Sequence, residues 1–156
     1  MKIAVSACLL GKPCRYNATG CYMAQVDALH KNHVLVPVCP EVLGGLATPR
    51  APSEICKGKV INTLGQDVSE AFEKGAKEAL AIVEDQGCQI AILQQRSPSC
   101  GCGKIYDGTF SSKLIEGDGV FTKLLKSKGI SVLSSDALAA DPAILEETPE
   151  MNVQDE

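Results

Sequence analysis

Residues 90–103 read Ile90-Ala91-Ile92-Leu93-Gln94-Gln95-Arg96-Ser97-Pro98-Ser99-Cys100-Gly101-Cys102-Gly103. The first four are apolar and rich in β-branched side chains, which predicts a short strand buried on both faces. The following ten residues contain Ser, Pro and Gly throughout and predict an irregular loop. Cys100 therefore lies in a loop just beyond the carboxyl end of a buried strand.

Two further cysteines follow apolar runs in the same way. Cys8 comes shortly after Ile3-Ala4-Val5, and Cys39 comes directly after Val34-Leu35-Val36-Pro37-Val38. If the three strands lie parallel in one sheet, all three thiols gather at its carboxyl edge, where open α/β sheets bind their ligands. A single free cysteine is often only a small buried hydrophobic side chain. Three cysteines in equivalent places favour a shared site instead.

The segment from Asp67 to Gly87 is long enough to be a crossover helix between the second and third strands. It opens with the spacing of a capping box, carries an apolar stripe on one face and ends at a glycine. Shorter helices are predicted over residues 19–31 and 120–127, and a fourth strand over residues 130–133. Strands alternating with helices predict an α/β fold with a parallel sheet.

The chain is long and apolar enough for one domain, with 156 residues of which 45% are hydrophobic. We predict that this domain spans residues 1–135, followed by an acidic tail over residues 136–156. Within this tail we predict a short helix at residues 143–147 and a frayed end. Residues 40–65 contain paired glycines and two prolines, and predict a long irregular loop of the kind that carries function.

The charge and the aromatic content predict the kind of partner. The net charge is −4, and the chain has no Trp, three Tyr and three Phe. A polynucleotide partner is therefore disfavoured, and a small-molecule substrate is expected. No segment is long and apolar enough to span a membrane, and the sequence indicates no particular oligomeric state.

The eight cysteines are predicted to be reduced. The apolar stretch before Cys8 is shorter than the ~7–15 residues that an export signal needs. We therefore expect a cytoplasmic protein, in which thiols serve metal binding or catalysis more often than disulfides.

The spacing of the cysteines predicts the kind of metal site. Structural zinc sites use close pairs of the type C-x₂₋₄-C, which this chain lacks, and its two histidines, His30 and His33, lie together away from the three strand ends. Three distant thiolates without histidine suit a soft site such as an iron-sulfur cluster. Cys14 and Cys102 lie near this site, either beside the ligands or as ligands themselves. A four-iron cubane held by Cys8, Cys39 and Cys100 leaves one iron open as a Lewis acid.

Two polar residues follow the same strand ends. Glu41 stands two residues beyond Cys39, and becomes a general acid or base if its surroundings raise its pKa toward neutrality. Ser97 lies in the Cys100 loop, where its hydroxyl can bind a polar substrate atom. The alternatives are a solvated loop glutamate and an ordinary turn serine.

Several ordered motifs together resemble those of the thiouracil desulfurases, a family of small bacterial proteins formerly of unknown function. The motifs are Cys8-Leu9-Leu10-Gly11 with Cys14-Arg15-Tyr16, Cys39-Pro40-Glu41 with Gly44-Gly45-Leu46 and Pro49-Arg50, and Ser97-Pro98-Ser99-Cys100-Gly101 followed by Ile105-Tyr106-Asp107-Gly108-Thr109-Phe110. The likeness runs to about Ser135.

The resemblance implies a Rossmann-like α/β domain with helices flanking a parallel sheet, and a 4Fe-4S cluster held by three cysteines that match Cys8, Cys39 and Cys100. It implies non-redox removal of sulfur from a thiolated pyrimidine, with Glu41 as the catalytic acid or base and Ser97 in contact with the substrate. Two other functions remain open: a different lyase or hydratase that uses the open iron, and a non-enzymatic carrier of a cluster or metal. A thiol-disulfide protein is disfavoured because the chain has no C-x-x-C motif.

Overall fold

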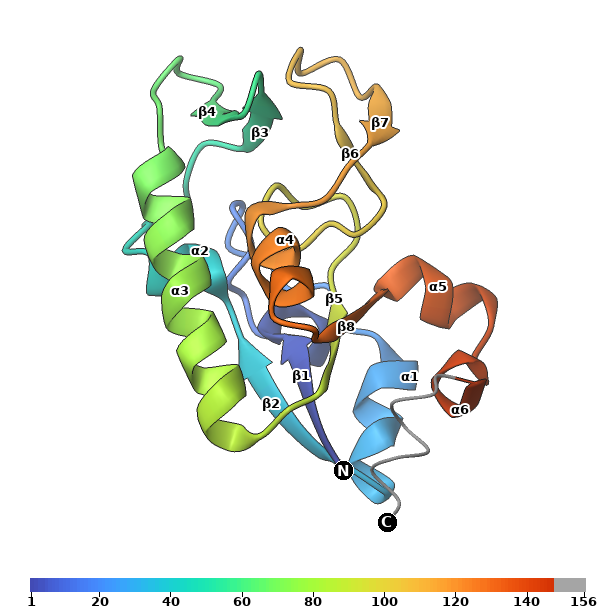
Figure 1. The fold of residues 1–156 in the computed structure, drawn as a ribbon. Helices are drawn as coiled ribbons and strands as arrows, with labels where there is room; N and C mark the ends of the chain where they lie inside the picture. Colours follow the sequence, from blue (N-terminus) through green and yellow to red (C-terminus); the bar gives the residue numbers. More distant parts are fainter. Residues whose placement is uncertain (148–156) are drawn as a thin grey trace.

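A four-stranded parallel sheet forms the centre of the molecule in the computed structural model, which describes residues 1–147 (Figure 1). Its strands are β1 (Lys2–Ser6), β2 (Val34–Val38), β5 (Ile90–Leu93) and β8 (Ser131–Ser134), in the order β2-β1-β5-β8. Ile3 of β1 pairs with Leu35 on one side and with Ile90 on the other. The predicted α/β fold and its parallel sheet are confirmed, with the fourth strand shifted by one residue.

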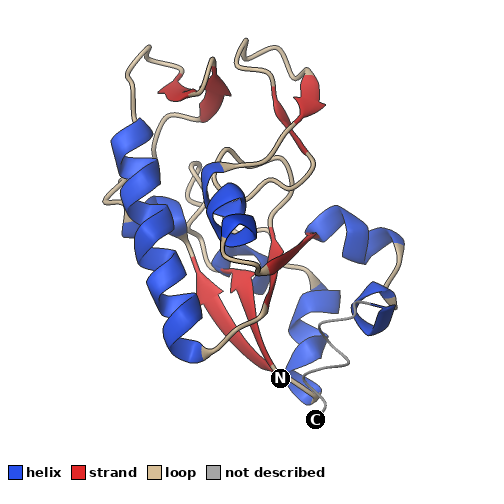
Figure 2. Ribbon diagram, in the orientation of Figure 1, coloured by secondary structure: helices blue, strands red, loops and turns tan. Residues whose placement is uncertain are grey.

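Helices cover both faces of this sheet (Figure 2). On one face, α3 (Ser69–Gln86) and α4 (Val120–Ser127) pack against Ala4 of β1. On the other face, Ile3 and Val5 pack against the 3-10 turn η1 (Ala7–Leu10), α1 (Ala24–Asp27), the 3-10 turn η2 (Ala28–Lys31), α5 (Ser135–Ala140) and α6 (Ile144–Glu147). Because side chains alternate along a strand, β1 contributes to both halves of the core.

Two of the predicted helices start later than expected. Residues 19–23 are not helical because the backbone N–H groups of Cys21 and Met23 donate to the carbonyls of Cys8 and Leu9, at 2.8 and 2.9 Å. Helix α3 begins at Ser69, since Asp67 Oδ1 accepts from the Ser69 N–H at 2.9 Å and forms a turn before the helix. The helix ends at Gly87, as predicted.

Two β-hairpins stand beyond the carboxyl edge of the sheet (Figure 1). One is β3 (Ser53–Cys56) with β4 (Lys59–Asn62), and the other is β6 (Lys104–Tyr106) with β7 (Leu114–Glu116). The first hairpin and α2 (Pro40–Leu43) lie inside the segment predicted to be irregular, so that prediction is wrong for these residues. The second hairpin was not predicted.

The C-terminal helices belong to the packed core as far as the structure describes them. Leu138 of α5 and Leu145 of α6 are 1% and 4% exposed. The short helix predicted near residue 145 is present as α6. The predicted frayed end falls on residues 148–156, outside the described residues, and the domain boundary at residue 135 stays a prediction. None of the described helices is both long and apolar enough to cross a membrane.

Candidate active site

The carboxyl edge of the sheet opens into a cavity of about 630 Å³. Five of the eight cysteines line this cavity: Cys8, Cys14, Cys21, Cys39 and Cys100. The three thiols that the strand pattern placed together are therefore brought together. Glu41 and Ser97 line the same cavity, and the two hairpins contribute Glu54, Tyr106 and Phe110 to its outer wall.

The Cys100 loop is fastened to the start of α4. The N–H of Phe121 donates to the Ser99 carbonyl at 2.9 Å, and the buried Thr122 hydroxyl donates to the Cys100 carbonyl at the same distance. Gly119 permits this approach, because a Cβ at that position would overlap the Ser99 carbonyl. The loop carrying Cys100 is thus held by a helix that packs in the core.

Cys39 and Glu41 are positioned by a contact between two glycines. Cys39 is the N-cap of α2, and Glu41 lies in the first turn of that helix. A Cβ on Gly44 would overlap the Ala71 carbonyl of α3, and a Cβ on Gly75 would overlap the Pro40 carbonyl. The backbones of α2 and α3 therefore touch directly, which fixes α2 against the longest helix of the described chain.

The cavity sets very different proton affinities for its thiols. Burial, together with the neighbouring Cys21 and Cys39, raises the pKa of Cys8 to about 12, and burial also raises the pKa of Cys100. A hydrogen bond from Cys14 lowers the pKa of Cys39 to about 7. Buried thiols of this kind lose their protons when a metal cation supplies positive charge, because a metal deprotonates the thiol that coordinates it.

The predicted 4Fe-4S cluster fits this donor set. Among the side chains that the structure describes, no three His, Cys, Asp or Glu residues converge closely enough to hold a single metal ion. A cubane binds each thiolate through a different iron atom, so its protein ligands stand farther apart than those of one ion. Soft thiols arriving from three separate strand ends around one cavity match that wider spacing.

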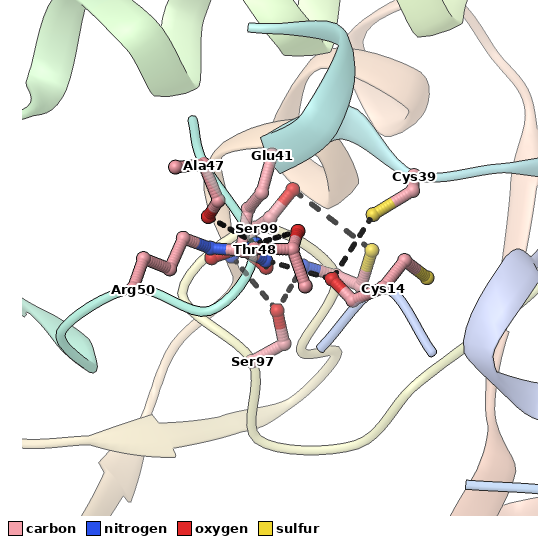
Figure 3. Close-up of polar contacts among 9 residues, drawn as sticks. Cys14, Cys39, Glu41, Ala47, Thr48, Arg50, Ser97 and Ser99 are labelled. Atoms are coloured by element: carbon pink, nitrogen blue, oxygen red, sulfur yellow. Dashed lines mark hydrogen bonds and ion pairs between the residues drawn. The ribbon is translucent and has the colours of Figure 1, made fainter. Parts of the chain in front are cut away.

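Glu41 forms an ion pair with Arg50 at the inner wall (Figure 3). Glu41 Oε2 lies 3.3 Å from Arg50 Nη2, and the two side chains are 20% and 9% exposed. Burial raises the pKa of the Glu41 carboxyl, while the charge of Arg50 and its hydrogen bond oppose this rise. The carboxyl group thus lies on the cavity with a pKa above its ordinary value and with a cation beside it.

Ser97 is fixed by the backbone of its own loop. Its Oγ accepts from the N–H of Ser99 at 3.1 Å and from the N–H of Cys100 at 3.0 Å (Figure 3). With both contacts used for accepting, the hydroxyl hydrogen remains for donation toward the cavity that Ser97 lines. Among the described residues, the Ser97 hydroxyl thus acts as an acceptor in two hydrogen bonds and keeps its own hydrogen for another partner.

A model of the 2-thiouracil desulfurase family matches residues 3–137. The chain belongs to the 2-thiouracil desulfurase family. The uncharacterized protein YbbK of Bacillus subtilis (strain 168) is 41% identical over an alignment of 146 residues, and the match covers 87% of this chain and 97% of the relative. A solved structure of TudS, a 4Fe-4S-dependent thiouracil desulfidase, matches with a TM-score of 0.85 and 42% identity, covering 94% of this chain and 99% of the other.

Three residues that shape the cavity of this desulfurase were not assigned a role from the sequence. Ser6, at the end of β1, accepts from the Gln94 N–H at 2.8 Å, and its hydroxyl partly offsets the rise that burial causes in the pKa of Cys100. Glu54 Oε1 accepts from the N–H groups of Gly108 and Phe110, at 3.0 and 3.1 Å, and joins the two hairpins. Arg50 holds Glu41. Of these three residues, only Ser6 could have been found from the sequence, because it is a polar residue at the carboxyl end of a predicted strand.

Proposed function

We propose that this protein removes sulfur from a thiolated pyrimidine of the thiouracil type, without net oxidation or reduction. A 4Fe-4S cluster held by Cys8, Cys39 and Cys100 is the cofactor. The observation that carries the proposal is the joint presence of these three thiols, Glu41 and Ser97 on one cavity. The family to which the chain belongs supports the substrate class.

The cluster, when bound, supplies an iron without a protein ligand, which is a Lewis acid. The protein supplies the remaining groups. Glu41 accepts a proton from the water that attacks the thiocarbonyl carbon, and Ser97 donates a hydrogen bond to a polar atom of the ring.

The overall reaction balances without an electron donor. One water molecule and the thiocarbonyl compound give the carbonyl compound and hydrogen sulfide. The carbon–sulfur bond breaks as the carbon–oxygen bond forms, and the proton taken by Glu41 leaves with the sulfur.

The test uses anaerobically reconstituted protein with 2-thiouracil in water enriched in ¹⁸O and with no reductant. We expect stoichiometric hydrosulfide and ¹⁸O in the product carbonyl. A requirement for a reductant with every thio-substrate would overturn the non-redox reaction. Transfer of the cluster to an apo-acceptor with no turnover would indicate a carrier, and turnover of hydroxy acids alone would indicate a hydratase or another lyase.

We also propose that the substrate is a free small molecule and that the protein acts in the cytoplasm. The net charge of −4 gives no support to polynucleotide binding. All eight cysteines are free thiols, as a reducing compartment would keep them. Localisation of a tagged full-length chain by cell fractionation tests the compartment.

A further inference from the structure

The guanidinium of Arg50 joins three separate segments of the chain. Nη1 donates to the Ala47 carbonyl at 3.1 Å and to Thr48 Oγ1 at 2.9 Å, within its own loop. Nη2 donates to the Cys14 carbonyl at 3.0 Å and lies 3.3 Å from Glu41 Oε2 (Figure 3). One nitrogen atom therefore connects the loop that follows η1 with α2.

Burying this cation is costly for the fold. The Arg50 side chain is only 9% exposed, and its Nε is buried without a hydrogen-bond partner among the described residues. A buried ion pair contributes little net stability compared with apolar side chains of similar volume, and an unsatisfied N–H adds a further cost. The arrangement calls for an explanation other than stability.

Arg50 leaves one oxygen of Glu41 available. The ion pair occupies Oε2, and the described part of the chain makes no hydrogen bond to Oε1. Glu41 lines the cavity, whereas Arg50 does not. Arg50 thus contacts the carboxylate of Glu41 without itself forming part of the cavity lining.

We propose that Arg50 is the positioning residue of the reaction: its fork fixes Glu41 Oε2 and thereby aims Oε1 at the attacking water. This inference rests on the proposed role of Glu41. A carboxylate without this partner rotates about its side-chain bonds, and misplacement of a catalytic group by about 1 Å is enough to cost ~10²-fold in rate.

Arg50 also joins two loops through its backbone, and this contact does not involve the guanidinium. The N–H of Arg50 donates to the Tyr16 carbonyl at 2.7 Å. Arg50→Met and Arg50→Lys both retain the backbone N–H that makes this bond between the two loops. The effect of such a variant therefore reports mainly on the guanidinium.

The test is a double-mutant cycle on anaerobically reconstituted protein, with Arg50→Met, Glu41→Gln and the double variant. Single-turnover rates with 2-thiouracil are normalised to iron content. We expect Arg50→Met to lower the single-turnover rate constant by at least ~10-fold and to change the half-saturating concentration of 2-thiouracil by less than about 3-fold, because Arg50 does not line the cavity. In the Glu41→Gln background, the same change should cost less than about 3-fold. Arg50→Lys, which keeps the charge and loses the fork, should restore only part of the rate.

Two further measurements do not depend on turnover. Iron content and the absorption spectrum should match the wild type in all variants. The midpoint of thermal unfolding should fall more for Arg50→Met in the wild-type background than in the Glu41→Gln background. Lys77→Met removes an exposed cation from α3 and should change neither rate nor midpoint.

Equal losses of rate from Arg50→Met in both backgrounds would overturn the inference, as would a full rate in Arg50→Met. A wild-type protein that is loaded with iron yet releases no sulfide would instead overturn the proposed function. The two failures are therefore distinguishable.

Discussion

At the scale of single residues, the cavity contains five thiols, and only three of them are proposed as ligands. We expect Cys8→Ser, Cys39→Ser and Cys100→Ser each to lose the cluster, because a neutral hydroxyl is a poor ligand for iron in place of a thiolate. Cys88→Ser should retain about four irons and four sulfides per chain, since Cys88 is buried in the core beneath α3. Iron and sulfide analysis after anaerobic reconstitution measures this.

Full iron occupancy in all three ligand variants would contradict the assignment. Cluster loss in Cys14→Ser, with the cluster intact in one of the three, would mean that the ligand set includes Cys14 instead.

Glu41 offers a second test at this scale. Glu41→Gln should keep its cluster and lose most of its turnover, because an amide does not accept the proton of the attacking water. General acid–base groups contribute ~10²–10⁴-fold, so the single-turnover rate should fall by that factor. A rate within a few-fold of the wild type, at equal iron content, would remove Glu41 from the mechanism.

At the scale of elements, the position of α2 depends on its contact with α3 through Gly44 and Gly75. Alanine is normally the better helix former, so Gly75→Ala would stabilise an isolated helix. Here its Cβ would overlap the Pro40 carbonyl, and we expect a net loss of about 1–3 kcal/mol in the free energy of unfolding. Because Pro40 stands between Cys39 and Glu41, iron content should fall as well.

The matched control is Ala81→Gly, at an exposed position of the same helix. It should cost about 1 kcal/mol through helix propensity alone and leave iron content unchanged. Denaturant unfolding and iron analysis on both variants measure the difference. Normal stability and a full cluster in Gly75→Ala would show that α2 is not held in this way.

The strands and the long helix could be predicted because each has a strong local signal. The runs before Cys8, Cys39 and Cys100 are apolar without interruption, and Gly87 ends α3 in the left-handed conformation with φ of 73°. The hairpins have no such signal. Residues 114–116 of β7 are all exposed, so no alternating pattern marks them as a strand.

The meeting of the three cysteines could be predicted from the strands, but the ion pair of Glu41 could not. Parallel strands bring their carboxyl ends to one edge whatever lies between them, so three cysteines at strand ends had to meet. The partner of Glu41 is different. Arg50 lies nine residues away in a loop without regular structure, and its approach to Glu41 depends on how that loop closes over the Cys14 carbonyl.

At the scale of the whole molecule, the C-terminal helices complete the core beneath the sheet. Leu138 is 1% exposed and packs with Ile3, Val5 and Ile92. We expect Leu138→Ala to lower the free energy of unfolding by about 2–5 kcal/mol. Ala140→Ser, at an exposed position of α5, should change it by less than about 0.5 kcal/mol. Equal effects of the two variants in urea unfolding would show that the domain ends before α5, as the predicted boundary has it.

The three proposed ligands come from segments that are about 30 and about 60 residues apart along the chain, so a group that binds all of them works as a three-way cross-link. Closing two long loops at once removes conformational entropy from the unfolded chain, as a pair of disulfides would. Oxidative loss of the cluster then removes this cross-link between Cys8, Cys39 and Cys100 in a single chemical event. A sample exposed to air should therefore be cleaved faster by a protease than an anaerobic sample, and this difference can be measured without an assay of turnover.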